Sequence, residues 1–122
     1  MKTILVADDQ ALARDVVRAV LRTNPAYQVQ EAENGAQALA LAQEQHPDLV
    51  LLDVQMPEMT GPEVCLRLKS SPETRDIPVV LMSGLEPEDV QGHAPMGSAD
   101  EFFTKPLRPK VLLARLKELL GE

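Results

Sequence analysis

Aromatic residues and cysteines are scarce in this sequence. The 122 residues include no tryptophan and only three aromatics, Tyr27, Phe102 and Phe103. The core is therefore expected to be aliphatic, and no aromatic platform is available for stacking nucleic-acid bases or sugars. The single cysteine, Cys65, excludes an intrachain disulfide and is expected to be a buried thiol in a helix.

Basic residues are outnumbered by acidic ones, and long apolar runs are absent from the sequence. Lys and Arg total 12 against 19 Asp and Glu, a net charge of −7, which opposes direct binding to nucleic acid. The first ten residues do not resemble a secretory signal, and no apolar run approaches the roughly 18 residues of a membrane span. We therefore expect a cytoplasmic protein without membrane insertion.

Short apolar stretches alternate with longer amphipathic segments, the pattern of repeated βαβ units around a parallel sheet. Strands are predicted at 3–7, 27–31, 49–52, 77–82 and 100–104. Helices are predicted after the first strand, from Asn34-Gly35 through Gln43, after an N-cap at Thr60, and over 108–120. The first helix is expected to bury one stripe, made of Ala13, Val16, Val17, Val20 and Leu21. We expect one α/β domain over residues 1–122, with an open doubly wound sheet.

The carboxyl ends of the strands carry most of the reactive side chains. In such sheets ligands bind outside these ends, and three carboxylates there would repel each other unless cations compensate. Lys105 supplies one positive charge, and a hard ion such as Mg²⁺ suits the oxygen ligands. Asp53 ends a buried central strand and would face both the metal and Lys105. It is then placed to attack phosphorus, because these cations neutralise charge on the phosphoryl oxygens, and Ser83 could donate a hydrogen bond to the transferred group. The residues at strand ends are Asp8 and Asp9, Asp53, Ser83 and Lys105.

Each of these residues also fits an ordinary structural role. Asp8-Asp9 suits the start of a helix, whereas Asp53 and Ser83-Gly84 suit turns. Lys105-Pro106 suits a loop with a solvated charge. Only their joint occurrence at successive strand ends points to function. His46 and His93 lie at no strand end, and we assign them no role.

The whole chain resembles the receiver domain of bacterial response regulators, the family of the chemotaxis response regulator. The motifs that carry the resemblance are Asp8-Asp9, Pro47 to Asp53 running into Met56 to Gly61, Met82-Ser83-Gly84, and Ala99 to Pro106. The resemblance implies a flavodoxin-like strand order, 2-1-3-4-5, with helices on both faces.

The resemblance also implies a role for each site residue. Asp53 would be the phosphoacceptor and Lys105 the partner of the phosphoryl group. Mg²⁺ would be bound by Asp9 directly, by Asp8 largely through water, by Asp53, and by the backbone carbonyl of Gln55. Ser83 would be the switch hydroxyl and Phe102 the switch aromatic, and the Lys105-Pro106 bond would be cis.

The function implied is a phosphorylation-activated signalling switch. Its partners would be a sensor histidine kinase or phosphotransfer protein, which donates from a phosphohistidine, and a downstream effector protein or domain. No enzymatic activity is implied beyond self-catalysed phosphotransfer and autodephosphorylation. Homodimerisation stays open, and the end at Glu122 suits a stand-alone regulator or a receiver excised from a larger one.

Three other functions compete with this one. A Mg²⁺-dependent phosphohydrolase resembling the haloacid dehalogenases would need a second Asp where Gln55 stands. A flavin-binding carrier would need a Ser/Thr/Gly-rich loop after the first strand, where Asp8 and Asp9 would repel phosphate. A degenerate receiver would act as a phosphorylation-independent interaction module.

The segment at residues 85–98, shortly after Ser83, departs from the family pattern. It contains two prolines and two glycines, at Pro87, Gly92, Pro95 and Gly97. Because these residues interrupt helices, any fourth helix is expected to be a short piece near residues 86–91.

Overall fold

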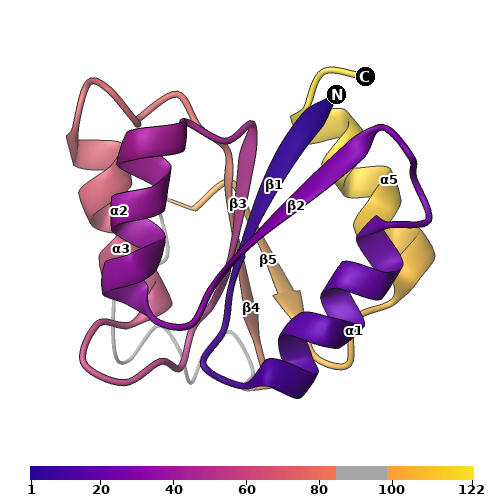
Figure 1. Ribbon diagram of the computed structural model, residues 1–122, viewed down its shortest axis with the longest axis horizontal. Helices are drawn as coiled ribbons and strands as arrows, with labels where there is room; N and C mark the ends of the chain where they lie inside the picture. The colour runs from indigo at the N-terminus through magenta and orange to yellow at the C-terminus, as the bar shows by residue number, and fades with distance from the viewer. Residues whose placement is uncertain (85–98) are drawn as a thin grey trace.

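The computed structural model of the chain describes residues 1–84 and 99–122, and its centre is a sheet of five parallel strands (Figure 1). The strand order is β2-β1-β3-β4-β5, which confirms the expected flavodoxin-like α/β topology. The strands are β1 (Lys2–Ala7), β2 (Tyr27–Ala32), β3 (Leu49–Asp53), β4 (Val79–Ser83) and β5 (Glu101–Thr104).

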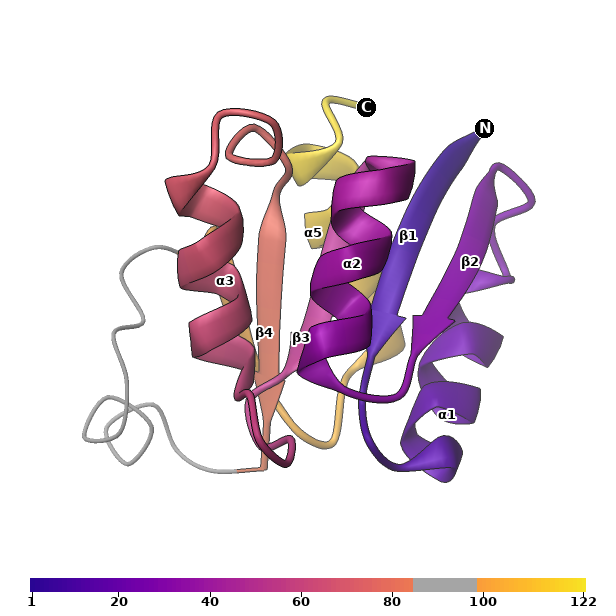
Figure 2. The same ribbon diagram turned by 60° about the vertical axis from the view of Figure 1, so that its left-hand side comes forward.

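The described helices cover both faces of the sheet (Figures 1 and 2). α2 and α3 lie side by side on one face, and α1 and α5 lie on the other. The described helices are at most 11 residues long, and none is long and apolar enough to cross a membrane. The short helix expected near residues 86–91 lies outside the described residues. The helices within residues 1–84 and 99–122 are α1 (Ala11–Leu21), α2 (Gly35–Gln45), α3 (Gly61–Ser70) and α5 (Pro109–Leu119).

Hydrophobic side chains form a separate core on each face of the sheet. Successive residues of a strand point to opposite faces, so a strand covered on both sides is apolar on both, as β3 is from Leu49 to Leu52. The core under α2 and α3 includes Leu5, Val50, Leu52, Leu81 and the buried thiol of Cys65. The core under α1 and α5 includes Ile4, Leu49, Leu51, Met82 and Leu116.

Several expected strand and helix boundaries were wrong by one or two residues. β4 begins at Val79, not at Ile77, because Pro78 has no N–H to donate to the ladder. Asp100 is not part of β5, because its carboxylate accepts a hydrogen bond from the Val79 N–H (2.7 Å). Each of the first four strands extends one residue beyond its predicted range at one end. α2 continues to Gln45 instead of ending at Gln43, and α5 is one residue shorter than predicted at each end.

The apolar stripe expected on α1 was partly wrong. Val17 and Leu21 are buried against the sheet, and they lie four residues apart on one helix face. Val16 is turned about 100° away from Val17 around the helix axis, and its side chain is 62% exposed. Val20 packs partly buried against the same core and Ala13 is half-buried, so only Val16 of the expected stripe lies off the packed face.

Candidate functional site

The ends of β1 and β3 bring the carboxylates of the site together. Ala7 pairs in register with Leu52, so the residues that follow them, Asp8 and Asp53, are neighbours at the carboxyl edge of the sheet. Asp8 is 2% exposed and Asp53 is 7% exposed, whereas Asp9 is on the surface. Carboxylate oxygens of Asp8, Asp9 and Asp53 all lie within 4.8 Å of one another.

Lys105 contributes a cation to this cluster from the end of β5. Its Nζ lies 3.0 Å from Asp8 Oδ2 and 3.3 Å from Asp53 Oδ1. Its backbone N–H donates to the Ser83 carbonyl (2.7 Å), and the Lys105-Pro106 bond is cis, as the resemblance implied. One ammonium group therefore faces three carboxylates, which leaves the cluster with an excess of negative charge.

The environment of Asp53 alters its acidity. Burial raises the pKa of the Asp53 carboxyl to about 6; the Lys105 ammonium opposes this rise, whereas the charges of Asp8 and Asp9 add to it. Burial would lower the pKa of Lys105, but its hydrogen bond to Asp8 and the charges of Asp53 and Asp8 raise it. Lys105 therefore stays protonated, and a second cation near Asp53 would favour the ionised carboxylate.

An open cleft gives solvent access to the cluster. It has a volume of about 410 Å³, large enough for several water molecules or a small anion. Gln55 lines it from the loop after β3, at the position where a phosphohydrolase of the competing type would need an Asp. The lining residues are Asp9, Gln10, Asp53, Gln55, Gly84 and Lys105.

Ser83 lies beside the cleft but does not line it. It is the last residue of β4, is fully buried, and pairs in register with Thr104 of β5. Its neighbour Gly84 reaches the cleft instead. Ser83 therefore stands between the strand end that carries Asp53 and the strand that carries Phe102.

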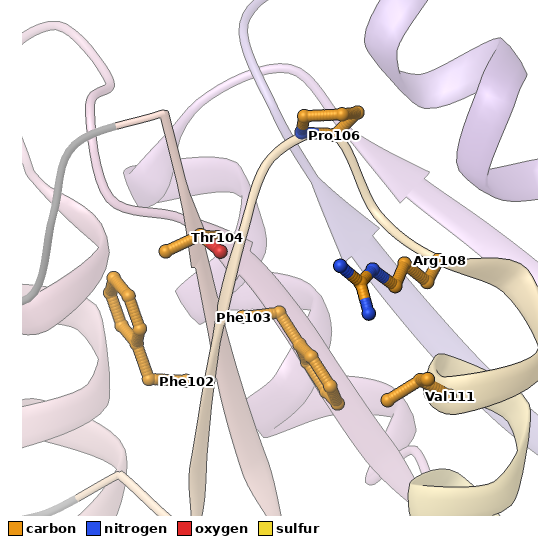
Figure 3. Close-up of a pocket in the computed structure, with 6 residues that line it drawn as sticks. All are labelled: Phe102, Phe103, Thr104, Pro106, Arg108 and Val111. Atoms are coloured by element: carbon orange, nitrogen blue, oxygen red, sulfur yellow. The ribbon is translucent and has the colours of Figure 1, made fainter.

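Phe102 and Phe103 point to opposite sides of β5 (Figure 3). Phe102 packs against the core under α2 and α3, and Phe103 packs against the core under α1 and α5. Arg108 and Val111 at the start of α5 lie on the side of Phe103. The pocket that these side chains line has a volume of about 310 Å³.

The start of α3 packs closely against the backbone of Asp53. The Gly61 N–H donates to the Val54 carbonyl (3.0 Å), and a Cβ at Gly61 would collide with the Asp53 carbonyl oxygen. Thr60 is the N-cap of α3, as predicted, and its hydroxyl accepts from the Glu63 N–H (3.3 Å). A glycine at the first helical position is thus required by close approach.

The alternative interpretation of Asp8-Asp9 as a helix cap was wrong. The N-cap of α1 is Gln10, which makes no side-chain capping hydrogen bond. Asp8 Oδ1 accepts from the Gln10 N–H (3.0 Å), a local turn that leaves Asp8 Oδ2 directed at Lys105. His46 ends α2 and contacts Asp76, away from the cluster, and His93 lies outside the described residues.

Two residues that contact the site were not identified from the sequence. Arg14 of α1 donates from Nη1 to the Asp8 carbonyl oxygen (2.7 Å), although in the sequence it is one of several charged residues of an amphipathic helix. Gly61 is the other; a glycine directly after a helix N-cap is a weak signal of close backbone approach.

Comparisons with known proteins show the family of the chain and agree with its fold. Residues 4–117 match the family model of the response regulator receiver domain. The phosphate regulon transcriptional regulatory protein PhoB of Pseudomonas aeruginosa is 40% identical over 119 residues, which span 98% of this chain but only 52% of PhoB. The polar-differentiation response regulator DivK of Brucella ovis is 30% identical over 121 residues, which span 99% of this chain and 98% of DivK.

A solved structure shares the fold closely. The signal receiver domain of a signal transduction histidine kinase from Syntrophus aciditrophicus is 34% identical, with a TM-score of 0.87, and the match covers 99% of this chain and 91% of that one. This TM-score shows that the two chains share a fold. The chain therefore belongs to the receiver domain family of two-component response regulators.

Proposed function

We propose that this domain is a phosphorylation-activated switch in which Asp53 accepts a phosphoryl group from a phosphohistidine. The observation that carries this proposal is the convergence of three carboxylates within 4.8 Å around an ammonium group that touches two of them. A surface selected for solubility alone would not bury Asp8 and Asp53 in this arrangement. The donor would be a sensor histidine kinase or a phosphotransfer protein.

The residues present fit a magnesium ion. The cluster offers carboxylate oxygens from Asp8, Asp9 and Asp53, and Gln55, whose backbone carbonyl would be a further ligand, lines the same cleft. Hard oxygen ligands of this kind, in a cleft open to water, suit Mg²⁺. When bound, Mg²⁺ would neutralise negative charge on the carboxylates and on the phosphoryl oxygens.

The chain's own residues would carry out the transfer. An Asp53 carboxylate oxygen forms a bond to phosphorus while the bond from phosphorus to the donor imidazole nitrogen breaks, and that nitrogen keeps the electron pair. Lys105, now paired with Asp53 Oδ1, would turn its ammonium to the phosphoryl oxygens. Hydrolysis of the acyl phosphate would restore the carboxylate, so the domain would catalyse only its own phosphorylation and dephosphorylation.

A phosphoester hydrolase is a weaker candidate on the same cleft. Such an enzyme needs a proton donor for the leaving group, and the Gln55 amide that stands in the relevant position has no acidic proton to give. The output would instead pass to an effector protein or domain. PhoB is named as a transcriptional regulatory protein, and this chain spans about half of its length.

Mass spectrometry of the intact chain tests the proposal. Acetyl phosphate or phosphoramidate with Mg²⁺ should add one phosphoryl group to the native chain and none to Asp53→Asn. Asp76→Asn is a matched control, because Asp76 is exposed and precedes β4 at the opposite edge of the sheet. Chelation of Mg²⁺ should abolish the adduct, and an adduct at full yield in Asp53→Asn would refute the assignment.

A further inference from the structure

Every polar atom of Asp8 has a hydrogen-bonding partner. Its N–H donates to the Ala32 carbonyl (3.2 Å), its Oδ1 accepts from the Gln10 N–H (3.0 Å), and its Oδ2 accepts from Lys105 Nζ (3.0 Å). The remaining atom, the carbonyl oxygen, accepts from Arg14 Nη1 (2.7 Å). The contact with Arg14 thus completes the restraint of Asp8 from the side of α1.

Arg14 is itself held in place by β2. Its Nε lies 3.3 Å from Glu31 Oε1, and its side chain is 13% exposed. Glu31 Oε2 also binds Arg18 Nη1 at 2.7 Å. A planar guanidinium can make both contacts at once, one with Nε and one with Nη1, which a lysine ammonium cannot reproduce. Because Asp15 also pairs with Arg18, the two carboxylates balance the two guanidiniums. The effect of Arg14 on the cluster is therefore geometric rather than a supply of positive charge.

The contact with the Asp8 carbonyl also restrains Asp9. The carbonyl of Asp8 and the N–H of Asp9 belong to one planar peptide unit. A contact that holds the Asp8 carbonyl oxygen therefore also restrains the orientation of this peptide plane, and with it the direction in which the Asp9 side chain leaves the backbone. Among the described residues, the Asp9 carboxylate has no hydrogen-bond or ion-pair partner of its own. Its direction therefore depends on its backbone.

We propose that Arg14 is a positioning residue that holds the Asp8–Asp9 peptide in the orientation in which Asp9 faces Asp8 and Asp53, and that it thereby sets the affinity of the cluster for a divalent cation. This inference rests on the proposed function, because the cation is the one that phosphorylation of Asp53 would require. Arg14 touches neither the cation nor the phosphoryl group and acts through the backbone of Asp8.

Calorimetric titration with Mg²⁺ alone tests the affinity. Arg14→Ala should weaken Mg²⁺ binding about 10-fold or more, the usual effect of losing a residue that orients a metal ligand. Arg14→Lys should be intermediate, because it keeps the charge but not both contacts. Arg18→Ala is the matched control: it lies one turn later on α1 and shares Glu31, but it does not touch Asp8, so its Mg²⁺ affinity should stay native.

Two further measurements separate positioning from a loss of stability. In the metal-free state, the backbone amide resonances of Asp9 and Gln10 should shift in Arg14→Ala and not in Arg18→Ala. The rate of phosphorylation by acetyl phosphate should fall at low Mg²⁺ and recover towards the native rate at saturating Mg²⁺. A purely structural role would not give a rate that Mg²⁺ rescues.

The possible outcomes distinguish this inference from the proposed function. Native Mg²⁺ affinity and native Asp9 resonances in Arg14→Ala would overturn the positioning role alone. An equal loss of affinity in Arg18→Ala would also overturn it. A native chain that binds no Mg²⁺ and is not phosphorylated would overturn the proposed function, and the positioning role with it.

Discussion

The Asp53 carboxyl group has to be buried within the site and also ionised for reaction, and these two requirements oppose each other. Burial at the end of β3 brings it next to Asp8 and Lys105, but burial also disfavours its ionised form and raises its pKa to about 6. Phosphoryl transfer needs the carboxylate as the nucleophile. A cation in the cleft would therefore promote the reactive form of Asp53, besides stabilising the transferred group.

The raised pKa of Asp53 predicts a pH dependence of stability in the presence of a chelator. The native state holds this proton more tightly than the unfolded chain, so the protonated group stabilises the fold below the ordinary pKa of 3.8, and this contribution is lost as the pH rises towards about 6. The free energy of unfolding of the native chain should therefore fall across this range relative to that of Asp53→Asn. Chemical denaturation at a series of pH values measures it, and parallel profiles for the two chains would contradict the prediction.

Asp8 and Asp9 should respond differently to neutralisation without metal. Asp9 is exposed and has no ion-pair partner among the described residues, so Asp9→Asn relieves repulsion and should stabilise the fold by about 0.5–1 kcal/mol. Asp8 is buried and pairs with Lys105, so Asp8→Asn removes a favourable contact and should not stabilise. Denaturation in EDTA distinguishes the two variants, and a larger gain from Asp8→Asn than from Asp9→Asn would be inconsistent with the observed ion pair.

Among the secondary-structure elements, the junction between β3 and α3 supports the backbone of the site residue Asp53. α3 begins where its first residue, Gly61, meets the backbone of Asp53 and Val54. A side chain at Gly61 would force the helix and the strand end apart. The geometry of Asp53 therefore depends on a residue that makes no contact with the cleft.

Gly61→Ala should destabilise the fold by about 1–3 kcal/mol, the usual cost of forcing an extra methyl group into a closely packed site. It should also slow phosphorylation, because Asp53 must move to admit the methyl group. Gly84→Ala is the control for stability, since a Cβ there meets no atom of the described residues within 4 Å. Equal free energies of unfolding for both variants would show that the junction between β3 and α3 accommodates the methyl group without loss of stability.

Across the whole molecule, β4 and β5 connect the site to the side chain of Phe102. Ser83 lies beside the strand end that carries Asp53, and Phe102 pairs in register with Leu81, two residues before Ser83 on the same strand. A phosphoryl group at Asp53 that drew the Ser83 hydroxyl towards it would alter the packing between these strands. Such a local change biases a two-state element.

Ser83→Ala should still be phosphorylated but should transmit less of the change to Phe102. The chain has only two phenylalanines, so ring resonances of labelled Phe can be followed individually, and Phe103 on the opposite side of β5 (Figure 3) is an internal reference. Beryllofluoride, a phosphoryl mimic, should shift the Phe102 resonances of the native chain more than those of Ser83→Ala. Equal shifts in the two chains would contradict the coupling.

Much of the architecture could be predicted because it depends on local patterns. The run Leu49 to Leu52 is apolar at every position, which indicates a strand covered on both faces, and β3 is such a strand. The rule for parallel sheets then predicted that Asp8 and Asp53 would meet. The boundaries of β4 and β5 were less predictable, because the ladder near Val79 is shared with the Asp100 side chain.

The α/β class, the family and the acidic and basic residues at the strand ends were all predictable before folding is considered, because periodicity, strand-end chemistry and motif spacing are properties of the linear chain. Three features became apparent only in the folded chain: the exposure of Val16 of α1, the contact of Arg14 with the Asp8 carbonyl, and the close approach of Gly61 to the backbone of Asp53. These features depend on how far a helix is rotated against the sheet and how closely two backbones approach. Such quantities are set by the packing of the whole domain, and no local pattern encodes them.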